Sequence, residues 1–184
     1  MTVADIVIIL VLAAGFLLGF FQGVVRGALN IFAFGIAFLL AANLRDDFGS
    51  YLASQWTSYD QEYDHMLAFL IAAIAILAIL SVLIHLGTRG PKGVTAYPLL
   101  DDLLGGALGV VMALLLMGGL LIILTSYYGP EAPIGLRSGA AWSANLYHNL
   151  LESRIGVLVK DVIVPALSLL FGSFVPDVVR RAMA

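Results

Sequence analysis

The side chains that could do chemistry are few in this sequence, and none of them stands in a catalytic pattern. His65, His85 and His148 are far apart, with no HExxH motif and no second histidine at ligand spacing, so we expect no metal site. No serine lies in a G-x-S-x-G or S-x-x-K motif, and "RGPKG" lacks the spacing of a phosphate-binding loop. We therefore predict a protein that is not an enzyme and that uses no cofactor.

Composition points to the membrane. Of the residues, 61% are hydrophobic and 11% are charged, and the mean hydropathy is +1.03, which is far from the balance of a soluble domain. There is no cysteine, so disulfides, thiolate metal sites and thiol nucleophiles are excluded. The net charge is −3 and the cations are scattered, so we expect no nucleic-acid partner. The composition predicts an integral membrane protein whose surroundings are a lipid bilayer.

A few charged residues border the apolar stretches and are the first candidates for a functional role. Arg26 could be an anchor at the cytoplasmic interface, or it could point inward and pair with Asp101 or Asp102. These two acids, and Asp5 near the start of the chain, could equally be helix starters that satisfy free amides and the helix dipole. The sequence leaves these alternatives open.

Glycine recurs at every fourth position in two apolar stretches. Gly15, Gly19 and Gly23 lie within one narrow face of a helix, and Gly105 and Gly109 repeat the spacing further along the chain. A stripe of glycines lets a neighbouring backbone approach closely, which is how helices associate in lipid. We predict helix packing at these positions, either inside one protomer or between protomers and along a pore.

The elements that position these residues are predicted to be four transmembrane helices. A single helix over residues 6–43 would be roughly 57 Å long, whereas the hydrocarbon core of a bilayer is about 30 Å thick. This block must therefore turn, and we place the turn near residues 22–27, where Arg26 reaches the interface and Gly27 can use its freedom at positive φ. The predicted spans are residues 4–22, 28–44, 66–86 and 103–124.

Loop charges then set the orientation. The short loops after the first and third spans hold Arg26, Arg89 and Lys92, whereas residues 43–65 carry mostly acids. Because cytoplasmic loops are enriched in Lys and Arg, both termini are predicted to lie outside the cytoplasm. A set of aromatic residues agrees with an outer interface; these are Tyr51, Trp56, Tyr59, Tyr63, Tyr127 and Tyr128.

The segment after the fourth span is amphipathic. A turn-rich break, "GPEAPIG", is followed by a short amphipathic stretch at residues 142–154, and Pro165 should kink or divide the next one. We expect these helices to lie in the outer interface, although a fifth span, which would place Arg180 and Arg181 in the cytoplasm, is the alternative. One apolar face of the second stretch is predicted to hold Leu158, Val159, Val162, Ala166, Leu169 and Leu170, opposite Lys160, Asp161 and Ser168.

The sequence therefore predicts an all-α, polytopic membrane protein. Residues 1–128 form a four-span transmembrane domain of two hairpins, and residues 129–184 form the amphipathic interfacial segment.

The tract G-x-x-x-G-x-x-x-G-x-x-R-G at residues 15–27, the acid before it, and D-x-L-L-G-x-x-x-G at residues 101–109 resemble the colicin V production protein family. The resemblance covers roughly residues 1–125. The chain departs from the family pattern at two positions. In the family an arginine typically follows the acid that begins the second motif, whereas this chain has Asp102. A second R-G typically follows in the same span, whereas this chain has Met112 and Ala113. The matching positions are Asp5, Gly15, Gly19, Gly23, Arg26, Gly27, Asp101, Gly105 and Gly109.

The resemblance implies a multi-pass protein of the bacterial inner membrane that acts in toxin production or export, or in envelope homeostasis, with no known enzyme activity. The chain is also similar to the membrane portion of certain periplasmic serine proteases, in which a four-span module precedes an outward catalytic domain. Two hypotheses follow. The protein is a homo-oligomer that associates through its glycine faces and serves as a channel or transport component, or it is a passive scaffold for an envelope partner such as a protease or secretion component.

Overall fold

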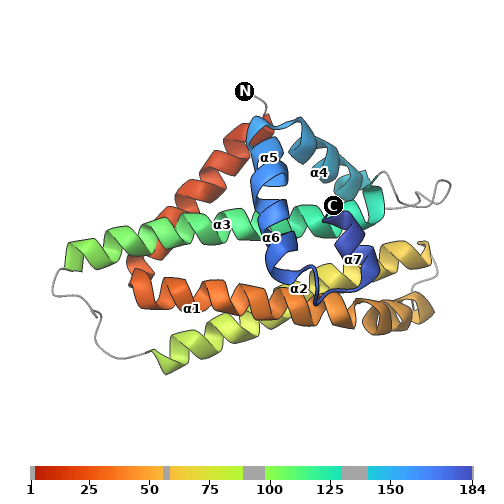
Figure 1. The fold of residues 1–184 in the computed structure, drawn as a ribbon, viewed down its shortest axis with the longest axis horizontal. Helices are drawn as coiled ribbons and strands as arrows, with labels where there is room; N and C mark the ends of the chain where they lie inside the picture. Colours follow the sequence, from red (N-terminus) through yellow and green to blue (C-terminus); the bar gives the residue numbers. More distant parts are fainter. Residues whose placement is uncertain (1–2, 56–58, 89–97, 130–140, 184) are drawn as a thin grey trace.

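The computed structural model describes residues 3–55, 59–88, 98–129 and 141–183, and within these ranges it contains helices and no strand. Three of the described helices are long and apolar enough to cross a membrane: α1 (Val3–Gln55), α2 (Gln61–Gly87) and α3 (Pro98–Tyr128) (Figure 1). Several residues used in the topology prediction lie outside the described ranges; these are Trp56, Arg89, Lys92 and most of the turn-rich break after the fourth predicted span.

Helix α1 consists of two arms that meet at a sharp break. Gly23 has φ 75° and ψ 173°, whereas the residues on either side are helical. In Figure 1 the first arm, residues 3–22, leaves this point in a different direction from the second arm, residues 24–55. The break falls inside the predicted interval, but the prediction that Gly27 takes the turn was wrong. Gly27 is helical and packs against Leu108, whereas Gly23 alone among the described glycines has a positive φ.

The second arm and α2 also extend further than the apolar pattern indicated. Residues 43–65 were expected to be a loop, yet α1 continues to Gln55 and α2 begins at Gln61. The charged residues here are compatible with helices because Arg45 pairs with Asp46 on α1 and with Glu62 on α2. At about 1.5 Å per residue the second arm is about 48 Å long, which exceeds the thickness of a bilayer core.

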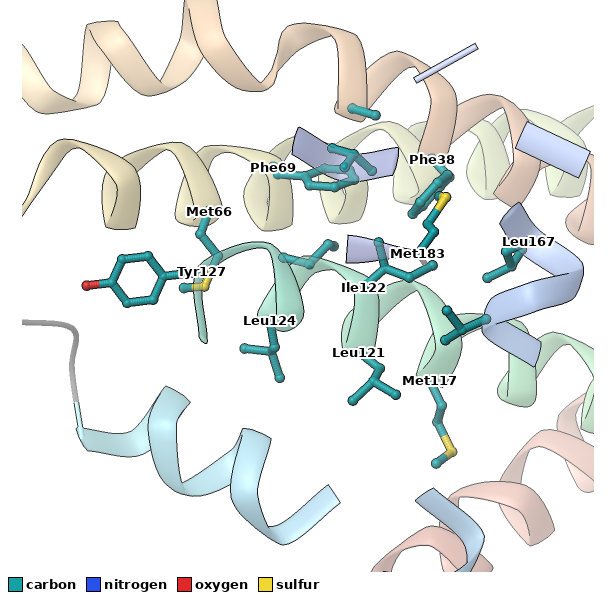
Figure 2. Packing of buried hydrophobic residues seen from close by; sticks show 14 of the residues in the cluster. Phe38, Met66, Phe69, Met117, Leu121, Ile122, Leu124, Tyr127, Leu167 and Met183 are labelled. Carbon is teal, nitrogen blue, oxygen red and sulfur yellow. The ribbon is translucent and has the colours of Figure 1, made fainter. Parts of the chain in front are cut away.

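The second arm, α2 and α3 pack along one another (Figure 1). The break in α1, the last turn of α2 and the first turn of α3 gather at one end, which we call the break end (Figure 1). The distal end holds the last turn of α1, the first turn of α2 and the last turn of α3. The core between the helices is formed by buried apolar side chains such as Phe38, Phe69, Met66, Ile122 and Leu124 (Figure 2).

The tail consists of short helices, of which α5 (Arg154–Leu158) packs on α1 and the others pack on α3. The others are α4 (Ala141–Glu152), the π-helical turn η1 (Val159–Ile163), α6 (Val164–Phe171) and α7 (Asp177–Ala182). Figure 1 shows α5 and α6 as one helical path that runs across α3. Pro165 was expected to kink or divide this path. The α-helical path is interrupted directly before Pro165 by the π turn, and this wider turn relieves the clash of the proline ring with the carbonyl group four residues earlier.

The apolar side chains of the tail divide between two faces. Val159, Val164 and Leu167 are buried, and Ile163 and Leu167 lie against Gly118 of α3. Most of the predicted apolar face points away from the bundle instead, since Leu158, Val162, Ala166, Leu169 and Leu170 are exposed, together with Lys160 and Asp161. The separation of apolar from charged residues is therefore less clean than the sequence pattern indicated.

Candidate functional site at the break in helix α1

Asp101 of α3 caps the second arm of α1. Breaking a helix leaves the first amides of the new helix without backbone partners. The Oδ1 atom of Asp101 accepts a hydrogen bond from the backbone N–H of Val24 at 3.4 Å. The Oδ2 atom lies so close to Gly23 that a Cβ there would be 2.5 Å away. Asp101 is 8% exposed, so this is a buried carboxylate at a helix N-terminus, where a negative charge is favourable.

Arg26 joins the break to the end of α2. Its Nε atom donates a hydrogen bond to Thr88 Oγ1 at 2.9 Å, and its terminal N–H donates to the Thr88 carbonyl oxygen. Thr88 itself donates from its hydroxyl to the Ile84 carbonyl oxygen at 2.7 Å. The guanidinium therefore sits at the C-terminal end of α2, where unpaired carbonyl groups and the helix dipole attract a cation.

A third polar contact crosses the break. The Nδ2 atom of Asn30 donates to Gln22 Oε1 at 2.9 Å, although the two residues are eight positions apart. In a straight helix they would be separated by about 12 Å along the axis. The contact is therefore a consequence of the bend, and the three polar side chains of the first apolar block, Gln22, Arg26 and Asn30, all lie at the break end.

The structure brings some of the predicted site residues together and separates others. Arg26 and Asp101 lie at the same break but have different partners, and within the described ranges no ion pair links Arg26 to Asp101 or to Asp102. Asp102 is partly exposed. Asp5 lies elsewhere, where its buried carboxylate accepts a hydrogen bond from Ser153 Oγ at 2.6 Å.

The two glycine stripes pack on each other within one chain. A Cβ on Gly19 would overlap the Gly105 carbonyl oxygen and lie 2.8 Å from the Gly109 Cα. A Cβ on Gly15 would lie 2.8 Å from the Gly109 carbonyl oxygen. At these distances the backbones of the first arm and α3 are in direct contact, so any side chain at these positions would force them apart.

A second polar cluster lies at the distal end, among charged residues that were expected in a loop. Arg45 is 2% exposed, and its guanidinium pairs with Asp46 at 2.8 Å and with Glu62 at 3.0 Å. His65 Nδ1 lies 3.5 Å from Asp46 Oδ1, and Asp64 is fully buried. The signal that could have revealed this cluster is the lack of any proline between residues 43 and 65, which permits two helices to continue and face each other.

Tyrosine hydroxyls complete the distal end. Asp60 accepts from the Tyr63 backbone N–H at 2.8 Å, as the N-cap of α2, and from the Tyr127 hydroxyl at 2.7 Å. Ser143 of α4 lies 2.8 Å from the Tyr128 hydroxyl and 3.2 Å from that of Tyr63. Tyr63, Tyr127 and Tyr128, which were expected at a lipid interface, are buried among the helices. Tyr63 and Tyr128 attach α4 through Ser143.

Comparison with known proteins gives one finding. The model of the family described as colicin V production protein matches residues 4–154 of this chain, a range that includes the break, both glycine stripes and Asp5. No match was found among curated proteins or among solved structures. The family is not a known enzyme family. Because the match covers most of the sequence, the chain belongs to the colicin V production protein family.

Proposed function

We propose that this protein is a non-enzymatic component of the bacterial inner membrane that supports toxin production or export, or envelope homeostasis, as an oligomeric channel or transport component. Family membership is the observation that carries this proposal. The test is deletion of the gene and complementation with the intact chain in a colicin V-producing strain. We expect the deletion to lower secreted toxin activity or to sensitise cells to detergents. Unchanged secretion and unchanged sensitivity would contradict the proposal.

The proposed placement in the membrane has four crossings: the two arms of α1, α2 and α3. Large apolar side chains point outward along these helices, among them Leu10, Phe21, Phe32, Ile74 and Ile79, which is the surface that lipid requires. The break end faces the cytoplasm, and both termini and the tail, residues 129–184, lie at the outer side.

Fusions with alkaline phosphatase test this orientation, since the enzyme is active only outside the cytoplasm. We expect an active fusion after Ala184 and an inactive one between residues 89 and 97. The reverse pattern would overturn the orientation, and an inactive fusion at both places would indicate that the tail crosses the membrane.

The break supports the channel or transport proposal. It gathers Gln22, Arg26, Asn30 and Asp101 at an interrupted apolar helix, and Asn30 Oδ1 has no hydrogen-bond partner among the described residues. Because the break joins two crossings at the cytoplasmic side, these polar groups would meet a solute at that end of the bundle. Since the glycine stripes are filled by each other, contacts between protomers would form on other exposed faces.

Flux measurements in liposomes separate this proposal from its alternative. The purified protein is expected to release entrapped ions, and Arg26→Gln is expected to reduce the release, whereas the matched variant Arg180→Gln, on the exposed surface of the tail, leaves it unchanged. Each variant is first checked for native helicity and size. An absence of flux from the unaltered protein would overturn the channel.

The second candidate function is a passive scaffold for an envelope partner. Ser143 attaches α4 to the bundle, and the hydrogen bond between Ser153 and Asp5 attaches α5. These contacts favour the scaffold because they hold both helices in a fixed position beside the bundle. Silent liposomes, together with a defined envelope protease or secretion protein that crosslinks to α4 in cells, would support the scaffold.

A further inference from the structure

Helix α6 is apolar on all sides. Its buried face holds Val164 and Leu167, and its exposed face holds Leu169, which is 88% exposed, and Leu170; Ser168 is its one polar residue. A helix that lies on a membrane surface has a polar face that meets water, whereas a helix that is apolar all round belongs inside protein or lipid. The bundle covers only one side of α6, so the other side requires an apolar environment.

The contacts of the tail with the long helices indicate how deep α6 lies. Ser153, at the start of the path, donates to Asp5 at the start of the first arm of α1. Further along, Ile163 packs on α3, where a Cβ on Gly118 would lie 2.7 Å from its Cγ2 atom. At about 1.5 Å per residue, Gly118 is about 9 Å from the distal end of the span predicted at residues 103–124. The path therefore starts at the membrane boundary and descends into the hydrocarbon core.

Phe171 marks the deepest point of this path. A Cβ on Gly35 would lie 3.1 Å from Phe171 Cζ, and the rings of Phe171 and Phe38 have centroids 6.1 Å apart. At about 1.5 Å per residue, Gly35 is about 14 Å from the distal end of the span predicted at residues 28–44. Half the thickness of a bilayer core is about 15 Å. The end of α6 therefore lies near the middle of the bilayer.

The chain turns back directly after Phe171. The N–H groups of Gly172 and Phe174 donate to the carbonyl oxygens of Ser168 and Phe171, and Asn43 Nδ2 donates to the Phe174 carbonyl oxygen at 3.1 Å. Backbone groups at this depth must find partners within the protein, and these bonds supply them. Figure 1 shows α7 on the distal side of α6, so the chain leaves the membrane on the side where it entered.

The charges along the tail agree with this path. Residues 162–176 include all of α6 and contain no charged residue, whereas Lys160 and Asp161 precede them and Asp177 follows. Charged side chains are costly within hydrocarbon, so the charge-free stretch can lie deeper than its two flanks. The flanks can stay near the boundary, where a lysine extends its ammonium group to water.

We propose that residues 153–176 form a re-entrant segment, which enters the hydrocarbon core from the distal side, reaches its middle at Phe171 and returns to the same side. The exposed side of α6 binds lipid acyl chains. It continues the lipid-facing surface of the second arm, because the exposed Ile36 is next to Gly35, against which Phe171 packs. The segment rests on the proposed four crossings, and it depends neither on their orientation nor on transport.

Spin labels in liposomes test this depth. The chain contains no cysteine, so each single-cysteine variant carries one label. Power-saturation EPR compares collisions with O2, which concentrates in hydrocarbon, and with a water-soluble nickel chelate. We expect the ratio of O2 to nickel accessibility at Leu169→Cys to match that at Ile36→Cys, in the middle of a crossing. Tyr51→Cys, at an exposed position beyond the apolar part of the same arm, should show the low ratio of a label in water.

Two results at α6 would overturn the segment. A ratio at Leu169→Cys as low as that at Tyr51→Cys would place α6 in water. A label sheltered from both reagents would show that protein, such as a second copy of this chain, covers this face instead of lipid. Leu170→Cys repeats the measurement if the first variant does not fold. A low ratio at Ile36→Cys would overturn the proposed crossings as well, whereas a low ratio at α6 alone overturns only the segment.

Discussion

At the scale of single residues, Asp101 caps a helix to which it does not belong. Its carboxylate binds the Val24 amide at the start of the second arm of α1. We predict that Asp101→Ala lowers the free energy of unfolding by about 1 kcal/mol, the usual loss on removing an N-cap. The measurement is unfolding by titration with SDS in mixed micelles. Asp102→Ala is the matched control, because Asp102 is the neighbouring and more exposed acid. An equal loss in the two variants would contradict the cap.

The glycine stripes make a second prediction at this scale. Gly19→Ala places a methyl group into the Gly105 carbonyl oxygen, whereas Gly87→Ala, at the end of α2, meets nothing within 4 Å. The first change should therefore lower the free energy of unfolding by about 1–3 kcal/mol, as overpacking does. Gly87→Ala should leave it unchanged or slightly raise it, because alanine reduces the conformational entropy of the unfolded chain. If Gly19→Ala were neutral in the same titration, close packing would not hold these helices together.

At the scale of elements, the contact between Arg26 and Thr88 fastens α1 to the end of α2. A double-mutant cycle with Arg26→Ala and Thr88→Val measures it, since valine removes the hydroxyl that accepts from Nε. We predict a coupling free energy of about 1 kcal/mol. The control cycle pairs Thr88→Val with Arg180→Ala, whose side chain lies on α7, and should show no coupling. A zero result in both cycles would contradict the hydrogen bond between Arg26 Nε and the Thr88 hydroxyl.

The sequence predicted the existence of these elements better than their limits. Apolar stretches at residues 66–86 and 103–124 lie inside α2 and α3, because hydropathy alone identifies a helix of membrane length. The apolar pattern ends at the first charged residues, however, so hydropathy could not show that the helices continue beyond them. That outcome depends on Arg45 and Glu62, which lie on different helices and neutralise each other only after those helices pack.

At the scale of the whole molecule, a buried hydrogen bond ties the tail to the start of the chain. Ser153 caps α5 by accepting from the Gly156 amide at 3.2 Å, and its hydroxyl donates to Asp5. Removing both bonds with Ser153→Ala should loosen α5, so we predict faster cleavage of the tail in limited proteolysis. Ser173→Ala, at an exposed position in the same tail, is the control. Equal cleavage rates in the two variants would show that other contacts suffice.

The sequence by itself determined that this is an apolar, helical chain of the colicin V production type, with a bend near residues 22–27 and glycines spaced for close helix packing. These features are local, because hydropathy and spacing along a helix do not depend on distant residues. Only the tertiary structure decided that Gly23 takes the positive φ, that Arg26 binds Thr88 while Asp101 caps Val24, and that Asp64 is buried. Each of these outcomes joins helices far apart in the sequence, and the partner of a charged group is fixed only when packing brings the helix ends together.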